Sequence, residues 1–176
     1  MTQADGITPD TKDWTWVLSE TCPECGFAAA EIAVGDVGPA VRDSIPRWRA
    51  ALVRPDVRER PAQGVWSPLE YAAHVRDVFR VFDERLVQIL TVRDPLFANW
   101  DQDAAALEGD YAGQDPATLA DQLERAGLVV ADRFDAVEPG DEDRPGRRSN
   151  GSVFTVRTLG QYFVHDVVHH LHDVRA

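Results

Sequence analysis

An amphipathic run at residues 67–92 constrains the fold of this chain more than any other sequence feature. Ser67, Pro68 and Glu70 begin the run with an N-cap, a first-turn proline and the acid of a capping box. The apolar side chains that follow recur at helical spacing, and they are Leu69, Val75, Val78, Phe79, Phe82, Leu86 and Ile89. The pattern predicts one long helix that ends near Val92.

Three more windows have helical spacing. They span residues 38–53, 116–134 and 155–174. Pro39 and Pro116 suit first helical positions, whereas Pro46 lies inside the first of these windows and is expected to kink or split it. No strand pattern outweighs these signals, so the sequence predicts an all-α fold, a four-helix bundle. The segment 138–152 is expected to be a turn-rich loop, and the connection 94–114 could hold a short helix.

The first 36 residues differ from the rest because prolines and glycines interrupt any helical period. They nevertheless contain Trp14, Trp16 and Phe27, and are too apolar for a disordered tail. We therefore expect residues 1–36 to form an ordered arm on a bundle made by residues 37–176, the two together forming a single domain.

The charge of the chain excludes several classes of partner. Acidic residues outnumber basic ones 30 to 18, which gives a formal net charge of −12. A nucleic-acid binder needs a basic face, and a polybasic membrane patch needs the same. No window is apolar enough for a transmembrane helix, and the N-terminus does not resemble a signal peptide. We therefore expect a cytoplasmic protein without a nucleic-acid or membrane partner.

Histidines are the most informative residues of the last window. Four of the five lie within eight residues: His165, His169, His170 and His172. His165 and His169 are four residues apart, so they share a helix face and suit one metal ion, whereas His170 points elsewhere. The fifth, His74, lies in the long helix among apolar neighbours. Facing helices of a bundle can combine such side chains, and three histidines with an open position form a usual catalytic zinc site.

Aspartates close to these histidines could accept the free ring N–H and fix the ring orientation. Asp77, three residues after His74, is therefore a predicted orienting residue, and so are Asp166 and Asp173, which flank the histidine cluster.

These residues together resemble the DinB / YfiT-like superfamily. The resemblance rests on Trp66-Ser67-Pro68 at the start of the long helix, on His74 with Asp77, and on the HxxxHH unit from His165 to His170. It implies a four-helix bundle with a divalent metal held by His74, His165 and His169, with Zn²⁺ expected and Ni²⁺ as the alternative. Members include S-transferases that use bacillithiol or mycothiol, a mycothiol-dependent isomerase and hydrolases. The arm resembles that of an actinobacterial sub-group.

Both cysteines belong to a CPEC unit in the arm, Cys22 and Cys25. They could bind a second metal ion together with His172 or His170, since a zinc site needs two further ligands. They could also form a redox pair, pack as reduced thiols, or send a thiolate to the three-histidine metal. The sequence leaves these alternatives open.

The sequence favours a metal-dependent enzyme that acts on a small electrophilic molecule. Trp100 could overhang the metal, and Arg147 and Arg157 are the predicted cationic contacts for an acidic substrate or thiol. The preferred reaction is S-transfer, in which a low-molecular-weight thiol of the mycothiol type is the co-substrate and attacks the electrophile. A metal-dependent hydrolase and a non-catalytic metal-binding stress-response protein are the alternatives, and a homodimer is left open.

Overall fold

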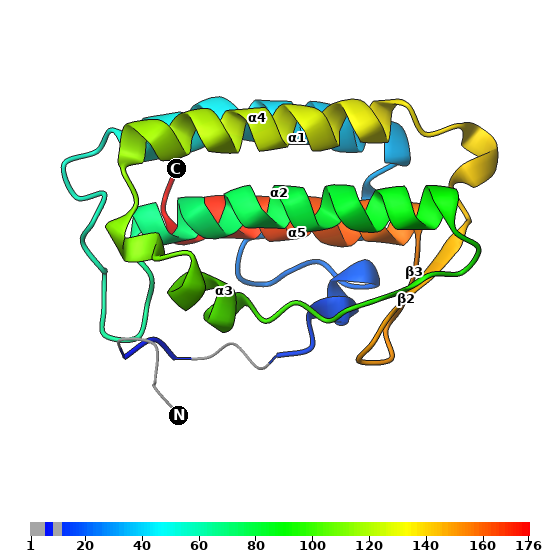
Figure 1. Cartoon of the computed structure of the whole chain (residues 1–176), viewed down its shortest axis with the longest axis horizontal. Coiled ribbons are helices and arrows are strands. Elements are labelled where there is room, and N and C mark those ends of the chain that lie inside the picture. The colour runs from blue at the N-terminus through cyan, green and yellow to red at the C-terminus, as the bar shows by residue number, and fades with distance from the viewer. Residues whose placement is uncertain (1–5, 9–11) are drawn as a thin grey trace.

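Four long helices form a bundle in the computed structural model, which describes residues 6–8 and 12–176 (Figure 1). They are α1 (Val34–Leu52), α2 (Pro68–Thr91), α4 (Pro116–Asp135) and α5 (Val156–Asp173). Around the bundle the order is α1, α4, α2, α5, and each helix packs against its two neighbours in this order. In Figure 1, α1 and α5 run in one direction and α2 and α4 in the other. The predicted four-helix bundle is confirmed.

Local capping sets where three of these helices begin. The Ser67 hydroxyl accepts the Glu70 N–H at 3.3 Å, and the Glu70 carboxylate accepts the Ser67 N–H at 2.8 Å, which confirms the capping box of α2. Asp115 caps α4 by accepting the Thr118 N–H at 2.8 Å. Thr155 caps α5 in the same way, because its side chain accepts the Thr158 N–H.

The first helix differs from its prediction at both prolines. It begins at Val34 rather than residue 38, because the Asp36 carboxylate accepts the Ala33 N–H at 3.1 Å and so extends the first turn. It also continues through Pro46 without a break. Ile45 and Trp48 are buried on either side of that proline, and this packing holds the helix together where one backbone hydrogen bond is lost.

The connections contain a small sheet that the sequence did not predict. Its strands are β1 (Leu96–Phe97), β2 (Pro145–Arg148) and β3 (Val153–Thr155), with β1 parallel and β3 antiparallel to β2. The expectation that 138–152 is only a loop is therefore wrong. Strands of two to four residues are too short to display a period, so the pairing of distant segments decides them. The other connecting elements are α3 (Gln102–Glu108), η3 (Tyr111–Gly113) and η4 (Pro139–Asp141).

The arm lies along α5, as Figure 1 shows for its short helices η1 (Trp14–Leu18) and η2 (Ala29–Glu31). The Gln161 side-chain amide ties it to the bundle by donating to the carbonyl oxygens of Ala30 and Ile32, both at 3.1 Å. The predicted ordered arm is thus observed from residue 12 onward, whereas residues 1–5 and 9–11 lie outside the described residues. No helix in the described part of the chain is long and apolar enough to cross a bilayer.

Candidate metal centre

Two pairs of side chains four residues apart on α5 face different neighbours. Because α2 and α5 are antiparallel, the first turns of α2 lie beside the last turns of α5. Asp166 and His170 face α2, where they meet His74. His165 and His169, about 100° away around the helix axis, face the arm and meet Cys22 and Cys25. In each group, the atoms that could bind a metal all lie within 4.8 Å of one another.

The structure therefore does not bring the predicted three-histidine set together. His74 lies in one group, while His165 and His169 lie in the other. The physical reason is the rotation of α5 about its axis, which turns Asp166 and His170 toward α2. Each of these residues directly follows one of the two predicted histidines, His165 and His169. His170, which the sequence analysis set apart from His165, is the histidine that accompanies His74.

The group around His74 combines two imidazoles and a carboxylate. His170 Nε2 lies 3.5 Å from one Asp166 oxygen, and His74 Nε2 lies 4.0 Å from the other. The two imidazole rings are 4.8 Å apart between centroids and meet edge to face. Asp166, which the sequence offered as an orienting residue, lies in the position of a ligand in this group.

A neighbouring aspartate determines which nitrogen of His170 carries the hydrogen. His170 Nδ1 lies 2.9 Å from Asp173 Oδ2. Burial opposes ionisation of Asp173, but this hydrogen bond and the electrostatic effect of the nearby histidines together outweigh burial and hold the pKa of that carboxyl below its ordinary value. An ionised carboxylate only accepts, so Nδ1 carries the hydrogen, and in the neutral ring the lone pair is on Nε2, toward Asp166. A histidine that binds a metal is commonly oriented by such a carboxylate.

His74 is the residue of this group whose surroundings best fit a metal ligand. Both of its ring nitrogens are buried, and neither has a hydrogen-bond partner among the described residues. Burial lowers the pKa of His74 well below its ordinary value, and a charge on His170 would lower it further, so the His74 ring is neutral. Trp66 and Trp100 pack against it, with ring centroids at 5.1 and 5.3 Å. A buried, neutral imidazole with no partner fits a metal ligand.

The second group is Cys22, Cys25, His165 and His169. Cys22 Sγ lies 3.7 Å from His169 Nδ1. Burial raises the pKa of the Cys25 thiol to about 11 and lowers that of His165 to about 4, so both are neutral in this environment. His172, one of the alternatives that the sequence offered as a further ligand, is exposed and does not belong to this group, although it lines a surface hollow together with Cys25. His165 and His169 are the histidines that lie with the cysteines.

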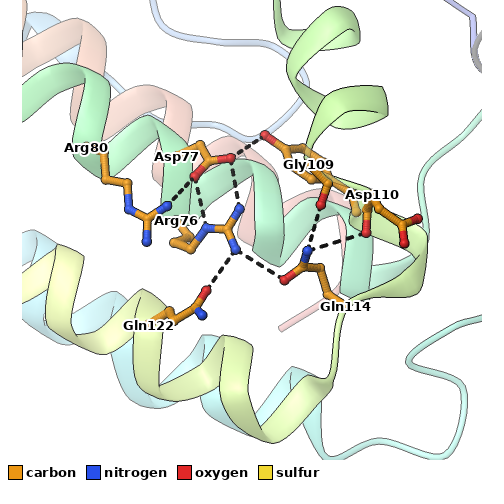
Figure 2. A network of polar contacts seen from close by, with 8 residues as sticks. Arg76, Asp77, Arg80, Gly109, Asp110, Gln114 and Gln122 are labelled. Atoms are coloured by element: carbon orange, nitrogen blue, oxygen red, sulfur yellow. Dashed lines mark hydrogen bonds and ion pairs between the residues drawn. The ribbon is translucent and has the colours of Figure 1, made fainter.

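Asp77 does not orient His74. Figure 2 shows it in a polar network between α2, α4 and the η3 turn. Arg76 and Arg80 donate to its carboxylate at 2.9 and 3.0 Å, and the Tyr111 hydroxyl donates to it at 2.7 Å. Arg76 also reaches Gln122 on α4 at 2.9 Å. The prediction of an orienting role is corrected: Asp77 lies one turn further along α2 than His74 and joins α2 to the η3 turn, whereas Arg76 makes the link to α4.

A cavity of about 280 Å³ lies beside both groups. From the two groups it is lined by His165, Asp166, His169 and His170, and around them by Lys12, Trp14, Glu24, Trp66, Tyr71, Gln102, Asp103, Tyr162 and Asp173, among others. Carboxylates outnumber cationic side chains in this lining, so the cavity is acidic. Its walls come from α2, α3, α5 and the arm.

Of the other predicted substrate residues, one lies near the site and two lie outside the cavity lining. Trp100 stacks on His74 with an interplanar angle of 15°, close to where the sequence placed it. Arg147 lies on β2 and pairs with Asp94 at 3.0 Å, and Arg157 pairs with Glu142 at 2.7 Å. Neither arginine lines the cavity. The prediction that they hold an acidic substrate is therefore not supported by their positions.

Sequence reasoning placed Asp173 beside the histidines as an orienting residue, but it assigned no ligand role to Asp166 and offered His170 only as a partner of the cysteines. The same four-residue spacing that marks His165 and His169 also marks Asp166 and His170, and it was the available signal.

Comparison with known proteins agrees with this architecture. The model of the DinB superfamily matches residues 41–174. The chain belongs to the DinB superfamily. Among solved structures, this DinB-superfamily chain is similar to YfiT from Bacillus subtilis, described as a probable metal-dependent hydrolase with an unusual four-helix bundle topology. The two share 16% sequence identity and a TM-score of 0.70 over 79% of this chain and 82% of YfiT, which shows the common fold. No curated protein matches the chain.

Proposed function

We propose that this protein is a divalent-metal-dependent hydrolase of small molecules, with His74, Asp166 and His170 as the metal ligands. The observation that carries the proposal is the buried His74 ring, because neither of its nitrogens has a hydrogen-bond partner among the described residues. His170 Nε2 and the Asp166 carboxylate lie beside it. Two histidines and one carboxylate with an open position form a known catalytic zinc arrangement. The similarity to YfiT adds support from a relative that is described in the same terms.

A bound Zn²⁺, or Ni²⁺ as the alternative, would lower the pKa of a water or thiol in its open position and so supply a nucleophile near neutral pH. The protein's own residues prepare the site for this chemistry. Asp173 fixes the tautomer of His170, and the indoles of Trp66 and Trp100 hold the His74 ring and exclude water from it. The acidic lining favours a neutral or cationic substrate over an anionic one.

Metal content and hydrolysis test this proposal together. His74→Ala and His170→Ala should each lose one equivalent of metal by elemental analysis and lose hydrolysis of a panel of neutral and cationic amides and esters. His172→Ala is the matched control, because it removes an exposed histidine from the same helix, and it should keep both. Unchanged metal content and activity in the His74 and His170 variants would refute the proposal.

Thiol S-transfer is the second candidate. A thiolate is a soft ligand that zinc binds well, and the aromatic part of the lining, Trp14, Trp66 and Tyr71, suits the carbon skeleton of a mycothiol-type co-substrate. Incubation with mycothiol and monochlorobimane should then form conjugate faster than the thiol alone, and His74→Ala should abolish the difference. A rate equal to the thiol-only background would reject S-transfer without affecting the hydrolase proposal.

A further inference from the structure

The second side-chain group is built differently from the His74 site. Cys22 and Cys25 come from the arm, and His165 and His169 come from α5. All four offer a ligand atom, and those atoms lie within 4.8 Å of one another. Cys22, His165 and His169 are buried, and Cys25 is partly buried. A soft, sulfur-containing set of four protein ligands is typical of a closed structural zinc site.

The backbone of the CPEC unit is shaped to present both thiols. The Gly26 N–H donates to the Cys22 carbonyl at 2.8 Å, and the Cys22 N–H donates to the Phe27 carbonyl at 3.0 Å. This tight turn requires a left-handed residue, and Gly26 supplies it with φ of 75°. Local hydrogen bonds therefore hold the two cysteines in place before any ion binds.

The spacing of the ligand atoms agrees with tetrahedral zinc. Bonds of about 2.3 Å to sulfur and about 2.0–2.1 Å to nitrogen, at a tetrahedral angle, place the two ligand atoms about 3.5 Å apart. The distance from Cys22 Sγ to His169 Nδ1 is 3.7 Å. The other nitrogen of His169, Nε2, lies 3.6 Å from Glu24 and 3.8 Å from Asp173, so carboxylates lie on the side away from the thiol.

His165 supplies an independent observation in favour of a bound ion. Its Nε2 is buried and has no hydrogen-bond partner within the part of the chain that the structure describes. A buried polar nitrogen of this kind is costly unless something binds it.

We propose that Cys22, Cys25, His165 and His169 form a structural Zn²⁺ site, separate from the His74 site, which fastens the arm to α5. Four protein ligands leave no open position, so this ion would stabilise rather than react. Trp14 packs against both histidines, with ring centroids 5.7 and 4.9 Å away, and Trp14 and Glu24 also line the cavity. The ion would therefore hold in place the segment that forms one wall of the candidate active site.

Metal stoichiometry of matched variants tests the site. Wild-type protein loaded with zinc should hold two equivalents, Cys22→Ser/Cys25→Ser one, and His74→Ala one. Loading with Co²⁺ distinguishes the two sites, because only thiolate ligands give a near-ultraviolet charge-transfer band. That band should be absent from the cysteine variant and unchanged in His74→Ala. A cysteine variant that keeps both equivalents, or a wild type without the thiolate band, would overturn the proposal, whatever the outcome at His74.

A measurement on the wild type keeps the test decisive if the cysteine variant fails to fold. Titrating the two thiols of zinc-loaded protein with a mercurial reagent should release one equivalent of zinc for two thiols, detected with a chromophoric chelator. Release of no zinc would contradict the proposal, and so would a mass two hydrogens below that of the reduced chain, since this shows a disulfide.

Discussion

At the scale of single residues, His170 depends on Asp173 for its orientation. The 2.9 Å contact to His170 Nδ1 fixes which nitrogen bears the hydrogen and leaves Nε2 for the ion. The same carboxylate has an oxygen 3.8 Å from His169 Nε2. Asp173 thus lies beside both candidate metal groups while belonging to neither.

Asp173→Asn should weaken metal binding at the His74 site by about 10–100-fold, because an amide orients the imidazole less strongly than a carboxylate does. Competition with a chromophoric chelator measures this, in a Cys22→Ser/Cys25→Ser background in which only one site remains. Asp143→Asn makes the same chemical change at an exposed acid and should leave the affinity unchanged. Equal affinities for the two variants would show that Asp173 does not orient His170.

The sequence predicted the residue types of the site better than their grouping. His74 and the HxxxHH unit were identified, as was the closeness of Asp166. The choice between His165 with His169 and Asp166 with His170 could not be made, because both pairs have the same spacing. It depends on how α5 is rotated against α2 and the arm, and that rotation is set by packing throughout the bundle.

At the scale of elements, α2 is held at its start by a buried charge. The Glu70 carboxylate accepts from Arg60 at 3.0 Å and from the Ser67 N–H and hydroxyl at 2.8 and 2.9 Å. Burial alone would raise the pKa of Glu70, but these hydrogen bonds outweigh it, so the pKa lies below the ordinary 4.5. This start positions His74 one turn later.

Glu70→Gln should lower the free energy of unfolding by about 1–3 kcal/mol at pH 7, because a charge-assisted network loses its charge. The folded-state pKa is depressed, so the advantage of the wild type is complete above pH 4.5 and disappears as the pH falls through the lower folded value. Urea unfolding at pH 7 and at acidic pH measures the difference. Glu84→Gln, at an exposed acid of the same helix, should show neither effect; a difference independent of pH would contradict the assignment.

Helix packing gives a second prediction at this scale. A Cβ on Gly127 of α4 would lie 2.9 Å from the Phe79 ring and 3.1 Å from Ile45, where α4 meets α2 and α1. Gly127→Ala should therefore cost about 1–3 kcal/mol by overpacking, more than the helix propensity it gains. Gly35→Ala, in α1 with open space around the new methyl, should be neutral or stabilising. Thermal unfolding compares them, and equal shifts of the two midpoints would reject the close approach.

The helices were predictable because caps and periodicity are local. Ser67, Asp115 and Thr155 mark their starts in sequence and in structure. The sheet was not predictable from the sequence, because β2 pairs with β1, which lies about fifty residues earlier in the chain. Neither strand is long enough to show an alternation of apolar and polar residues.

At the scale of the whole molecule, the net charge of −12 continues into the cavity. Glu24, Asp103 and Asp173 line it together with Asp166, against Lys12. On composition alone, this net charge argues against nucleic acid as a partner. The structure extends this argument to the substrate, because the two arginines predicted to admit an acid lie elsewhere.

Binding of small probes should follow this charge. A cationic ligand of the cavity should lose affinity as the salt concentration rises, whereas an anionic ligand of similar size should bind more weakly at low salt and improve with screening. Isothermal titration at several salt concentrations measures both. Glu24→Gln should reduce the preference, with Glu142→Gln, an acid outside the cavity, as the control. An anion that binds best at low salt would contradict this account.

On α5 the pair His165 and His169 lies next to the pair Asp166 and His170. This has a consequence for how such a site can change over evolution. Inserting one residue into α5 before His165 turns everything after it by about 100°. His165 and His169 would then take the positions of Asp166 and His170 and face His74, giving an all-histidine set and depriving the cysteines of their partners. The apolar stripe of α5 would turn as well, so the core resists the insertion. Helix register, and not the choice of amino acids alone, is thus the variable that determines ligand identity in this bundle.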